Sequence, residues 1–235
     1  MKGFYTIAVL IGFVLLSAFA QAEEQTEILH ADVGSIVTFG RYEQDGNPDN
    51  GTEKIEWIVL DVQGNKSLLI SRYGLDVQQY NENYTAITWE DCTLRSWLNG
   101  SFLNTAFSAA EQNAILTTLV DNGENQGYSG YVADGGNNTE DKVFLLSYAE
   151  AWKYFEEDSA RMCAPTDYAL TQGTYTDSGN KVDGKAACRW WLRSPGNPNF
   201  AMLVLSTGRH SNTTVSYRRN AIRPAFWLNL DSEIF

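Results

Sequence analysis

The residues best suited to chemistry lie near the C-terminus, where cationic and aromatic side chains gather in an otherwise acidic chain. The 235 residues carry a formal net charge of −12, yet the segment from Gly184 to Leu230 has seven basic residues and no Asp or Glu. Arginine binds carboxylates and similar anions through two parallel hydrogen bonds, and tyrosine adds an aromatic face. We therefore predict that an anionic or polyhydroxyl ligand binds over the segment from Gly208 to Arg219. The predicted ligand-binding residues are Arg193, Arg209, His210, Tyr217, Arg218 and Arg219.

The same arginines also have a structural interpretation, in which they neutralise carboxylates from the acidic remainder of the chain or lie along the rim of a sheet. The two interpretations predict different mutants. Exposed ion pairs contribute only about 0–1 kcal/mol, whereas removing one partner of a buried pair costs about 3–5 kcal/mol. Arg218 and Arg219 are the residues at which the two interpretations are best separated.

Signals for catalysis are few. The chain has no G-x-S-x-G, and its two histidines leave little for a Ser-His-Asp arrangement. Gly135-Gly136 is not followed by the Lys of a phosphate loop. Acidic pairs such as Glu90-Asp91 are expected by chance in a chain this acidic. We expect a binding or interaction module for a glycan or a surface protein, without catalysis or a cofactor. An exported carbohydrate-active hydrolase and a structural cell-envelope domain remain the alternatives.

The cysteines favour a disulfide over a metal site. There are three, at 92, 163 and 188, and no spacing typical of a zinc site. Cys163 and Cys188 flank one polar connection, and a bond between them would close a loop of ~25 residues and stabilise the fold by roughly 3 kcal/mol. We predict that these two are bonded and that Cys92 is a free, buried thiol.

One acidic segment partly fits a calcium-loop template. Asp45, Asn47, Asp49 and Glu56 fall at positions 1, 3, 5 and 12, but the Gly that the template needs is one residue late and strands flank the loop. We therefore interpret this segment as a plain hairpin loop and expect no metal.

The N-terminus reads as a signal peptide. Lys2 precedes the apolar run from Thr6 to Ala20, and Ala20-Gln21-Ala22 has the small residues of a cleavage site. This run is shorter than the ~20 residues of a membrane-spanning helix. We expect a secreted or otherwise exported protein, extracellular or periplasmic, with no membrane span in the mature chain. We also expect it to be monomeric and to be repelled by nucleic acid because of its negative charge.

Strand and helix patterns indicate one α+β domain. Alternating apolar residues predict strands at residues 36–42, 55–62, 66–72 and 143–146, and three more strands after residue 188. A hydroxyl residue followed three positions later by a carboxylate predicts helix starts at Thr88, Ser108 and Ser147. The Gly- and Asn-rich stretches at 121–141 and 171–183 predict long surface loops. Strands at both ends and about three helices in the middle favour a single, mostly antiparallel domain. The expected divisions are a signal peptide at 1–22, a polar lead-in at 23–35, the domain at 36–230 and a short acidic tail at 231–235.

Several motifs also carry a resemblance. The C-terminal W-W-L-R-S-P-G and R-P-A-F-W-L-N-L, with F-G-R-Y, I-E-W-I-V-L-D, T-L-R-S-W-L-N and D-K-V-F-L-L-S upstream, resemble a bacterial secreted domain family of unknown function. That family is similar to C-type-lectin-like folds, so the resemblance implies such a fold for this chain. The same superfamily includes formylglycine-generating enzymes, which depend on two nearby C-terminal cysteines. Here Cys188 is alone in that region, so the resemblance implies no such chemistry.

The Ala20-Gln21-Ala22 site generates the first prediction. We expect the exported protein to begin at Glu23 because signal peptidase cleaves after a small-x-small sequence. The intact mass of secreted material measures this directly. A mass that retains the apolar N-terminus would contradict it.

Overall fold

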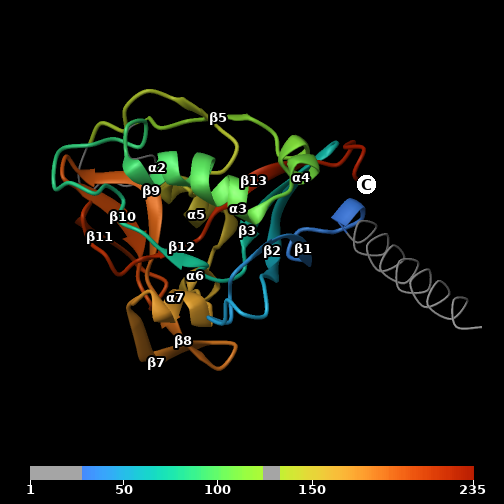
Figure 1. Cartoon of the computed structure of the whole chain (residues 1–235). Coiled ribbons are helices and arrows are strands. Elements are labelled where there is room, and N and C mark those ends of the chain that lie inside the picture. The colour runs from blue at the N-terminus through green and yellow to red at the C-terminus, as the bar shows by residue number, and fades with distance from the viewer. Residues whose placement is uncertain (1–27, 124–132) are drawn as a thin grey trace, which may run out of the picture.

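The computed structural model describes residues 28–123 and 133–235 (Figure 1). The predicted signal peptide and the first residues of the lead-in lie outside these ranges. Within the described residues, no helix is both long enough and apolar enough to cross a membrane. The predicted polar lead-in is not wholly external, because Ile28 is buried against the core.

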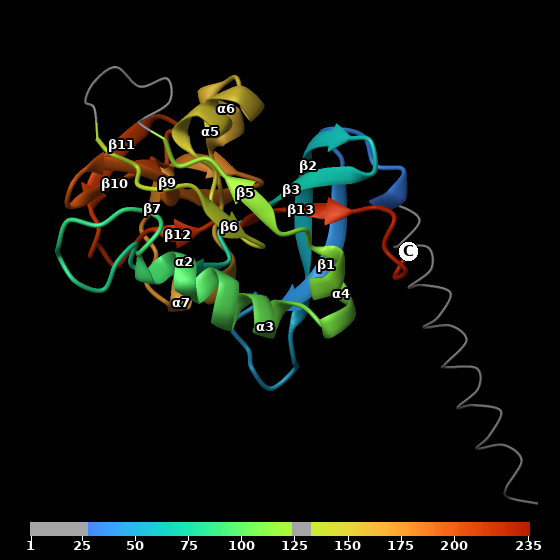
Figure 2. The same cartoon turned by 90° about the horizontal axis from the view of Figure 1, so that it is seen from above.

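The fold is rich in antiparallel sheet, as predicted, and has two main sheets. The first has the order β1-β2-β3-β13, with β1 at Ile36–Tyr42, β2 at Glu53–Gln63, β3 at Lys66–Ser71 and β13 at Ala225–Asn229. The second has the order β11-β10-β9-β12-β4, with β11 at His210–Thr214, β10 at Phe200–Val204, β9 at Trp190–Asn197, β12 at Ala221–Ile222 and β4 at Asp76–Val77. Only the contact of β9 with β12 is parallel among the pairs of these strands. Figure 2 shows the two sheets at opposite ends of the molecule.

Two hairpins complete the sheet structure. One pairs β5, Thr118–Val120, with β6, Thr139–Asp141, and the other pairs β7, Thr176–Val182, with β8, Lys185–Cys188. The second hairpin corrects the loop predicted at 171–183. Its turn is Asp183-Gly184, and both residues have positive φ, which matches the right-handed twist of the flanking strands.

The helical segments are short and lie between the strands. They are α2 at Thr93–Trp97, the π-helical turn η1 at Leu98–Phe102, α3 at Leu103–Ala106, α4 at Ala109–Ala114, α5 at Tyr148–Tyr154, α6 at Asp158–Arg161 and α7 at Asp167–Thr171. The capping boxes predicted at Ser108 and Ser147 are both present, each with its glutamate three residues later. From above, α5 and α2 lie on opposite sides of the five-stranded sheet (Figure 2).

Two local predictions are wrong, and one helix is short. The first helix begins at Thr93 rather than at Thr88, and the Cys92 thiol caps it. The second helix ends at Ala114, because Ile115 turns extended to bridge Leu228 of β13. Residues 143–146 form no strand; they are a buried extended segment in which Phe144 alone bridges β13.

Both tryptophans of the W-W pair are fully buried, although they point to opposite faces of β9. The indole N–H of Trp190 donates to the Arg161 carbonyl at 3.0 Å, and that of Trp191 donates to the Gln78 carbonyl at 2.9 Å. Neither ring face is therefore available to stack on a ligand. The pair anchors β9 in the core, where large aromatic groups contribute most to burial.

The buried carboxylate of Asp141 generates a stability prediction. It accepts hydrogen bonds from the Trp89 indole at 2.9 Å, from the Arg95 guanidinium at 2.6 Å and from the Thr139 hydroxyl at 2.8 Å. Asp141→Ala should lower the free energy of unfolding by about 3–5 kcal/mol, because it leaves three donors without an acceptor. Urea unfolding measures the loss. The neighbouring Glu140 is exposed, so Glu140→Ala is the matched control and should change stability by less than ~0.5 kcal/mol.

Candidate anion-binding surface

Three connecting segments meet beside the β7–β8 hairpin. Tyr175 lies between α7 and β7, Arg189 separates β8 from β9, and Arg219 lies between β11 and β12. The Tyr175 backbone N–H donates to the Arg219 carbonyl at 2.8 Å, and the N–H of Ala221 donates to the Arg189 carbonyl at 2.7 Å. Backbone hydrogen bonds therefore fix all three residues relative to one another.

The side chains of these residues form a compact basic cluster. The Arg189 guanidinium lies 3.8 Å from the centre of the Tyr175 ring, and the Arg219 guanidinium lies 5.9 Å from it. The Arg219 Nε also donates to the Gly173 carbonyl at 3.1 Å. Arg218 and Arg219 are exposed, while Tyr175 and Arg189 are half-buried. We call Tyr175, Arg189, Arg218 and Arg219 the basic surface.

The arginines of the basic surface have no carboxylate partners among the residues that the structure describes. The ion pairs there involve other cations: Arg72, Arg95, Lys153, Arg161, Lys185 and Arg193. In addition, the Nε of Arg189 is buried and has no hydrogen-bond partner in the same residues. A nearby carboxyl, that of Asp177, has a lowered pKa because of the Gly179 backbone N–H, then Asn180, Ser206 and Arg189. Apart from this longer-range interaction of Asp177 with Arg189, the cations of the basic surface have no ion pair within the described residues.

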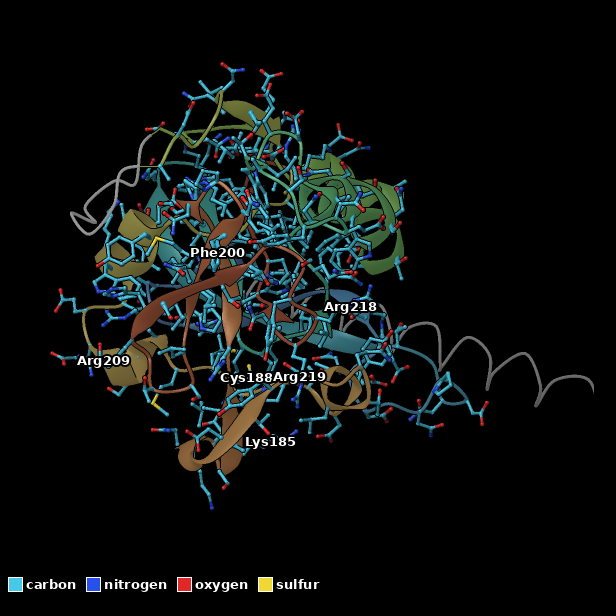
Figure 3. The ribbon with its side chains drawn as sticks, turned by 90° about the vertical axis from the view of Figure 1, so that its left-hand side faces the viewer. Lys185, Cys188, Phe200, Arg209, Arg218 and Arg219 are labelled. Atoms are coloured by element: carbon cyan, nitrogen blue, oxygen red, sulfur yellow. The ribbon has the colours of Figure 1, made fainter. Side chains whose placement is uncertain are left out.

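The predicted site residues do not all come together. Arg218, Arg219 and the half-buried Tyr217 lie at one end of β11, whereas Arg209 and His210 lie at its other end. Figure 3 shows Arg209 apart from Arg218 and Arg219. Within the segment over which the ligand was predicted to bind, residues 210–214 form a strand that pairs with β10 along its whole length. The strand is polar and half-buried at an edge, so it lacks the apolar alternation by which strands are recognised.

His210 belongs to a packed aromatic cluster. Its ring meets Tyr148 edge-on at 5.5 Å and Trp152 at 5.7 Å, and Trp152 stacks on Tyr148 at 4.3 Å. The Arg161 guanidinium lies 4.1 Å from the Trp152 ring centre. Partial burial lowers the pKa of His210, as do Arg209 and Arg161. The histidine is therefore neutral at pH 7 and joins α5 to β11 through ring contacts.

Arg193 serves an internal ion pair. It is 3% exposed, its guanidinium binds both carboxylate oxygens of Glu150, and it donates to the carbonyls of Leu145 and Asp121. It also lines a small cavity. The centre of a water molecule placed there could occupy a volume of only about 10 Å³. A space of this size holds about one water. Arg193 therefore links β9 to α5 and is not part of the basic surface.

Two residues of the basic surface were not among the predicted ligand-binding residues. Arg189 belongs to the basic run but was not selected, and Tyr175 lies in the stretch predicted to be a loop. The Asp183-Gly184 dipeptide is the signal that could have found them, because an Asp-Gly turn predicts a hairpin. That hairpin pairs Thr176 with Cys188, which places Tyr175 beside Arg189.

The cysteines lie as the disulfide prediction requires, although all three are free thiols in this structure. Cys163 and Cys188 face each other in an isolated antiparallel bridge. Cys92 lies elsewhere, where its sulfur accepts the Arg95 N–H at the start of α2. The bond between Cys163 and Cys188 remains a prediction.

One group of carboxylates in the described chain has metal-ligand spacing: Glu43, Asp45 and Glu53. Their oxygens accept backbone N–H groups of the β1–β2 loop, from Gln44, Asp45, Gly46 and Asn47. Glu56 of the calcium-loop template instead pairs with Arg72 at 2.8 Å. The acidic group holds the hairpin loop together.

The comparison with known proteins gives a family. The sequence model described as Domain of unknown function (DUF6273) matches residues 64–230. No curated protein and no solved structure matches the chain. Since the match covers more than half of the sequence, the chain belongs to the DUF6273 family.

The contrast between internal and exposed arginines generates a second stability prediction. Arg193→Ala should lower the free energy of unfolding by about 3 kcal/mol or more, because it leaves Glu150 and the Leu145 and Asp121 carbonyls without their donor. Arg218→Ser should change it by less than ~0.5 kcal/mol, because that side chain is exposed. Thermal and urea unfolding of both variants measure the difference. Equal losses in the two variants would contradict these assignments.

Proposed function

We propose that this chain, which belongs to the DUF6273 family, is an exported module with a C-type-lectin-like fold that binds an anionic glycan on the basic surface. The proposal includes a single domain, a bacterial origin, and secretion through the N-terminal signal sequence. The observation that carries the binding role is the pair of Arg189 and Arg219 beside Tyr175, with the exposed Arg218 next to them in the chain. None of the three has an ion-pair partner among the described residues, in a chain whose net charge is −12. Because the chain as a whole is acidic, we infer that a ligand supplies the anion that these arginines bind.

The chemistry of the cluster suits an acidic sugar. A guanidinium binds a carboxylate or sulfate through two parallel hydrogen bonds, and each charge-assisted bond contributes about 1.5–3 kcal/mol. Tyr175 adds an aromatic ring and a hydroxyl, which suit the apolar face and the hydroxyl groups of a saccharide. Loops carried on rigid sheets are common sites of recognition, and all four residues lie on connections between the elements of the fold.

Hydrolysis finds less support in the same geometry. A glycosidase needs two carboxyl groups about 5–9 Å apart around the scissile bond. The basic surface is instead dominated by cations. The cavity beside Arg193 has one carboxylate residue, Asp121, in its lining and room for about one water. We therefore favour binding over carbohydrate hydrolysis and over a purely structural role in the cell envelope.

Glycan-array binding with the mature protein, residues 23–235, tests the proposal. We expect acidic glycans, with carboxylated or sulfated sugars, to bind and their neutral counterparts not to bind. Arg218→Ser with Arg219→Ser should weaken binding roughly 100-fold, which is about 2.7 kcal/mol, and should leave the melting temperature nearly unchanged because the side chains are exposed. Binding should also weaken as salt rises, because exposed charges are screened.

Arg209→Ser is the matched control. Arg209 is also an exposed arginine, but it lies at the other end of β11, so its loss should leave glycan affinity unchanged. Binding that depends on Arg209 and not on Arg218 and Arg219 would overturn the proposed site. Binding only to acidic proteins, or equal binding to neutral and acidic glycans, would overturn the proposed ligand.

A further inference from the structure

Asn220 is a buried polar side chain without a partner. It lies between Arg219 of the basic surface and Ala221 of β12, and it is 0% exposed. Neither its amide nitrogen, Nδ2, nor its amide oxygen, Oδ1, has a hydrogen-bond partner among the described residues. A buried polar group without a hydrogen bond costs free energy, and such groups are rare outside functional or strained sites. Hydrogen bonding inside the protein therefore does not explain why an amide occupies this position.

The strand pairing places Asn220 beside Arg189. β12 runs parallel to β9 with Ala221 opposite Trp190, and the Ala221 N–H donates to the Arg189 carbonyl at 2.7 Å. Successive side chains of an extended backbone point to opposite faces, and paired strands lie about 4.8 Å apart. The residues that precede this pair, Asn220 and Arg189, are therefore neighbours on the face opposite to Ala221 and Trp190.

The outer end of the Arg189 guanidinium is the part that a ligand can reach. Its Nε is buried and has no partner in the described chain, and the guanidinium carbon lies 3.8 Å from the centre of the Tyr175 ring. The residue as a whole is half-buried. Because the ring covers one flat face and the protein covers the Nε edge, the two terminal nitrogens remain for an acceptor from solution. Two such N–H groups in one plane match the two oxygens of a carboxylate or a sulfate.

The charge of Arg189 has no direct counter-ion in the part of the chain that the structure describes. Asp177 interacts with it at longer range. The oxygens of Asp177 already accept hydrogen bonds from the Gly179 N–H at 2.9 Å, the Asn180 amide at 2.8 Å and the Ser206 hydroxyl at 3.4 Å. An aspartate at position 220 would have the shape of Asn220 but would carry a negative charge beside Arg189. The neutral amide leaves the guanidinium charge for an anion from outside.

We propose that Arg189 binds the acidic group of the glycan, and that Asn220, by staying neutral, leaves the charge of Arg189 available to it. This inference rests on the proposed function and names the cation of the basic surface that holds the acidic group. Arg218 and Arg219 are exposed and add positive charge around it. Asn220 itself does not touch the ligand, because it is fully buried, and it acts through Arg189.

Two substitutions of similar shape separate charge from packing. Asn220→Asp adds a carboxylate beside Arg189, whereas Asn220→Leu removes the amide and stays neutral. The probes are a heparin-derived tetrasaccharide, which is sulfated, and tetragalacturonate, which is carboxylated, each titrated calorimetrically into the mature protein. Asn220→Asp should weaken binding roughly tenfold or more, the effect of losing one charge-assisted hydrogen bond. Asn220→Leu should keep the affinity within about twofold, because the amide has no hydrogen bond to lose.

Arg189→Met tests the same contact from its other side. Methionine keeps an unbranched side chain over Tyr175 but removes the charge, so this variant should bind the probes at least as weakly as Asn220→Asp. Asn220→Asp should also lower the melting temperature more in the Arg189→Met background than in the wild-type protein, because its buried carboxylate then has no cation beside it. This difference measures the contact between the two positions without any ligand.

The outcomes distinguish this inference from the proposed function. Binding that is lost in Arg218→Ser with Arg219→Ser, but is equal in Asn220→Asp and Asn220→Leu, would overturn the inference and leave the proposed function standing. An equal loss of melting temperature from Asn220→Asp in both backgrounds would overturn it as well. If neither probe binds the wild-type protein, the proposed function fails and the inference fails with it.

A variant that does not fold leaves the test decisive. If Asn220→Asp is unfolded, Arg189→Met and Asn220→Leu decide between them. Weakened binding by folded Arg189→Met, together with wild-type affinity in Asn220→Leu, supports the inference. Wild-type affinity in Arg189→Met contradicts it.

Discussion

The fold depends on how the chain crosses between its two main sheets, which it does from β3 to β4 and again from β12 to β13. β12 ends at Ile222 in the five-stranded sheet, and β13 begins at Ala225 in the four-stranded sheet. The two residues between them are buried, and the Pro224 carbonyl accepts the Ser71 N–H at 2.9 Å while Arg223 donates to the Ser71 carbonyl. Pro224 directly precedes β13, which is an edge strand of the four-stranded sheet. Proline suits this position because it offers no N–H that a buried crossing would have to satisfy.

The basic C-terminal segment serves two physical purposes that composition alone could not separate. Arg193 and Arg223 are internal, where Glu150 neutralises the first and aromatic rings with a carbonyl surround the second. Arg218 and Arg219 are exposed and have no ion pair among the described residues. A buried guanidinium needs its hydrogen bonds inside the protein, whereas an exposed one keeps its water or takes a ligand. The structural interpretation thus holds for Arg193 and Arg223, whereas ligand binding by Arg218 and Arg219 stays a prediction.

Short-range sequence patterns correctly located the elements that are stabilised mainly by contacts between residues close in the sequence. The alternation of Ile36–Tyr42 gave β1 with its observed bounds, and the capping boxes at Ser108 and Ser147 gave the starts of α4 and α5. Errors arose where tertiary contacts decided the conformation. Ile115 leaves the helical pattern because β13 offers it a bridge. Likewise, β11 is a strand because β10 pairs with it, and nothing in His-Ser-Asn-Thr-Thr shows that neighbour. The predicted site residues lie apart for the same reason, since strand geometry separates Arg209 from Arg218.

Close packing at Gly74 explains why the Cys163–Cys188 pair and the basic surface occur at one join of the chain. A Cβ at this position would lie 2.6 Å from the Ala221 Cβ and 3.3 Å from the Cys188 sulfur. The backbone N–H of Gly74 donates to the Ala164 carbonyl at 3.0 Å. Only glycine lets these segments approach so closely, because any side chain at this position would overlap with the Cβ of Ala221 in β12. The join of β8 to β9 is thereby held with Cys188 pointing inward and the next residue, Arg189, reaching Tyr175 on the outside. The alternation of side chains along an extended backbone thus places the sulfur pair in the core and the cation on the surface within two consecutive residues.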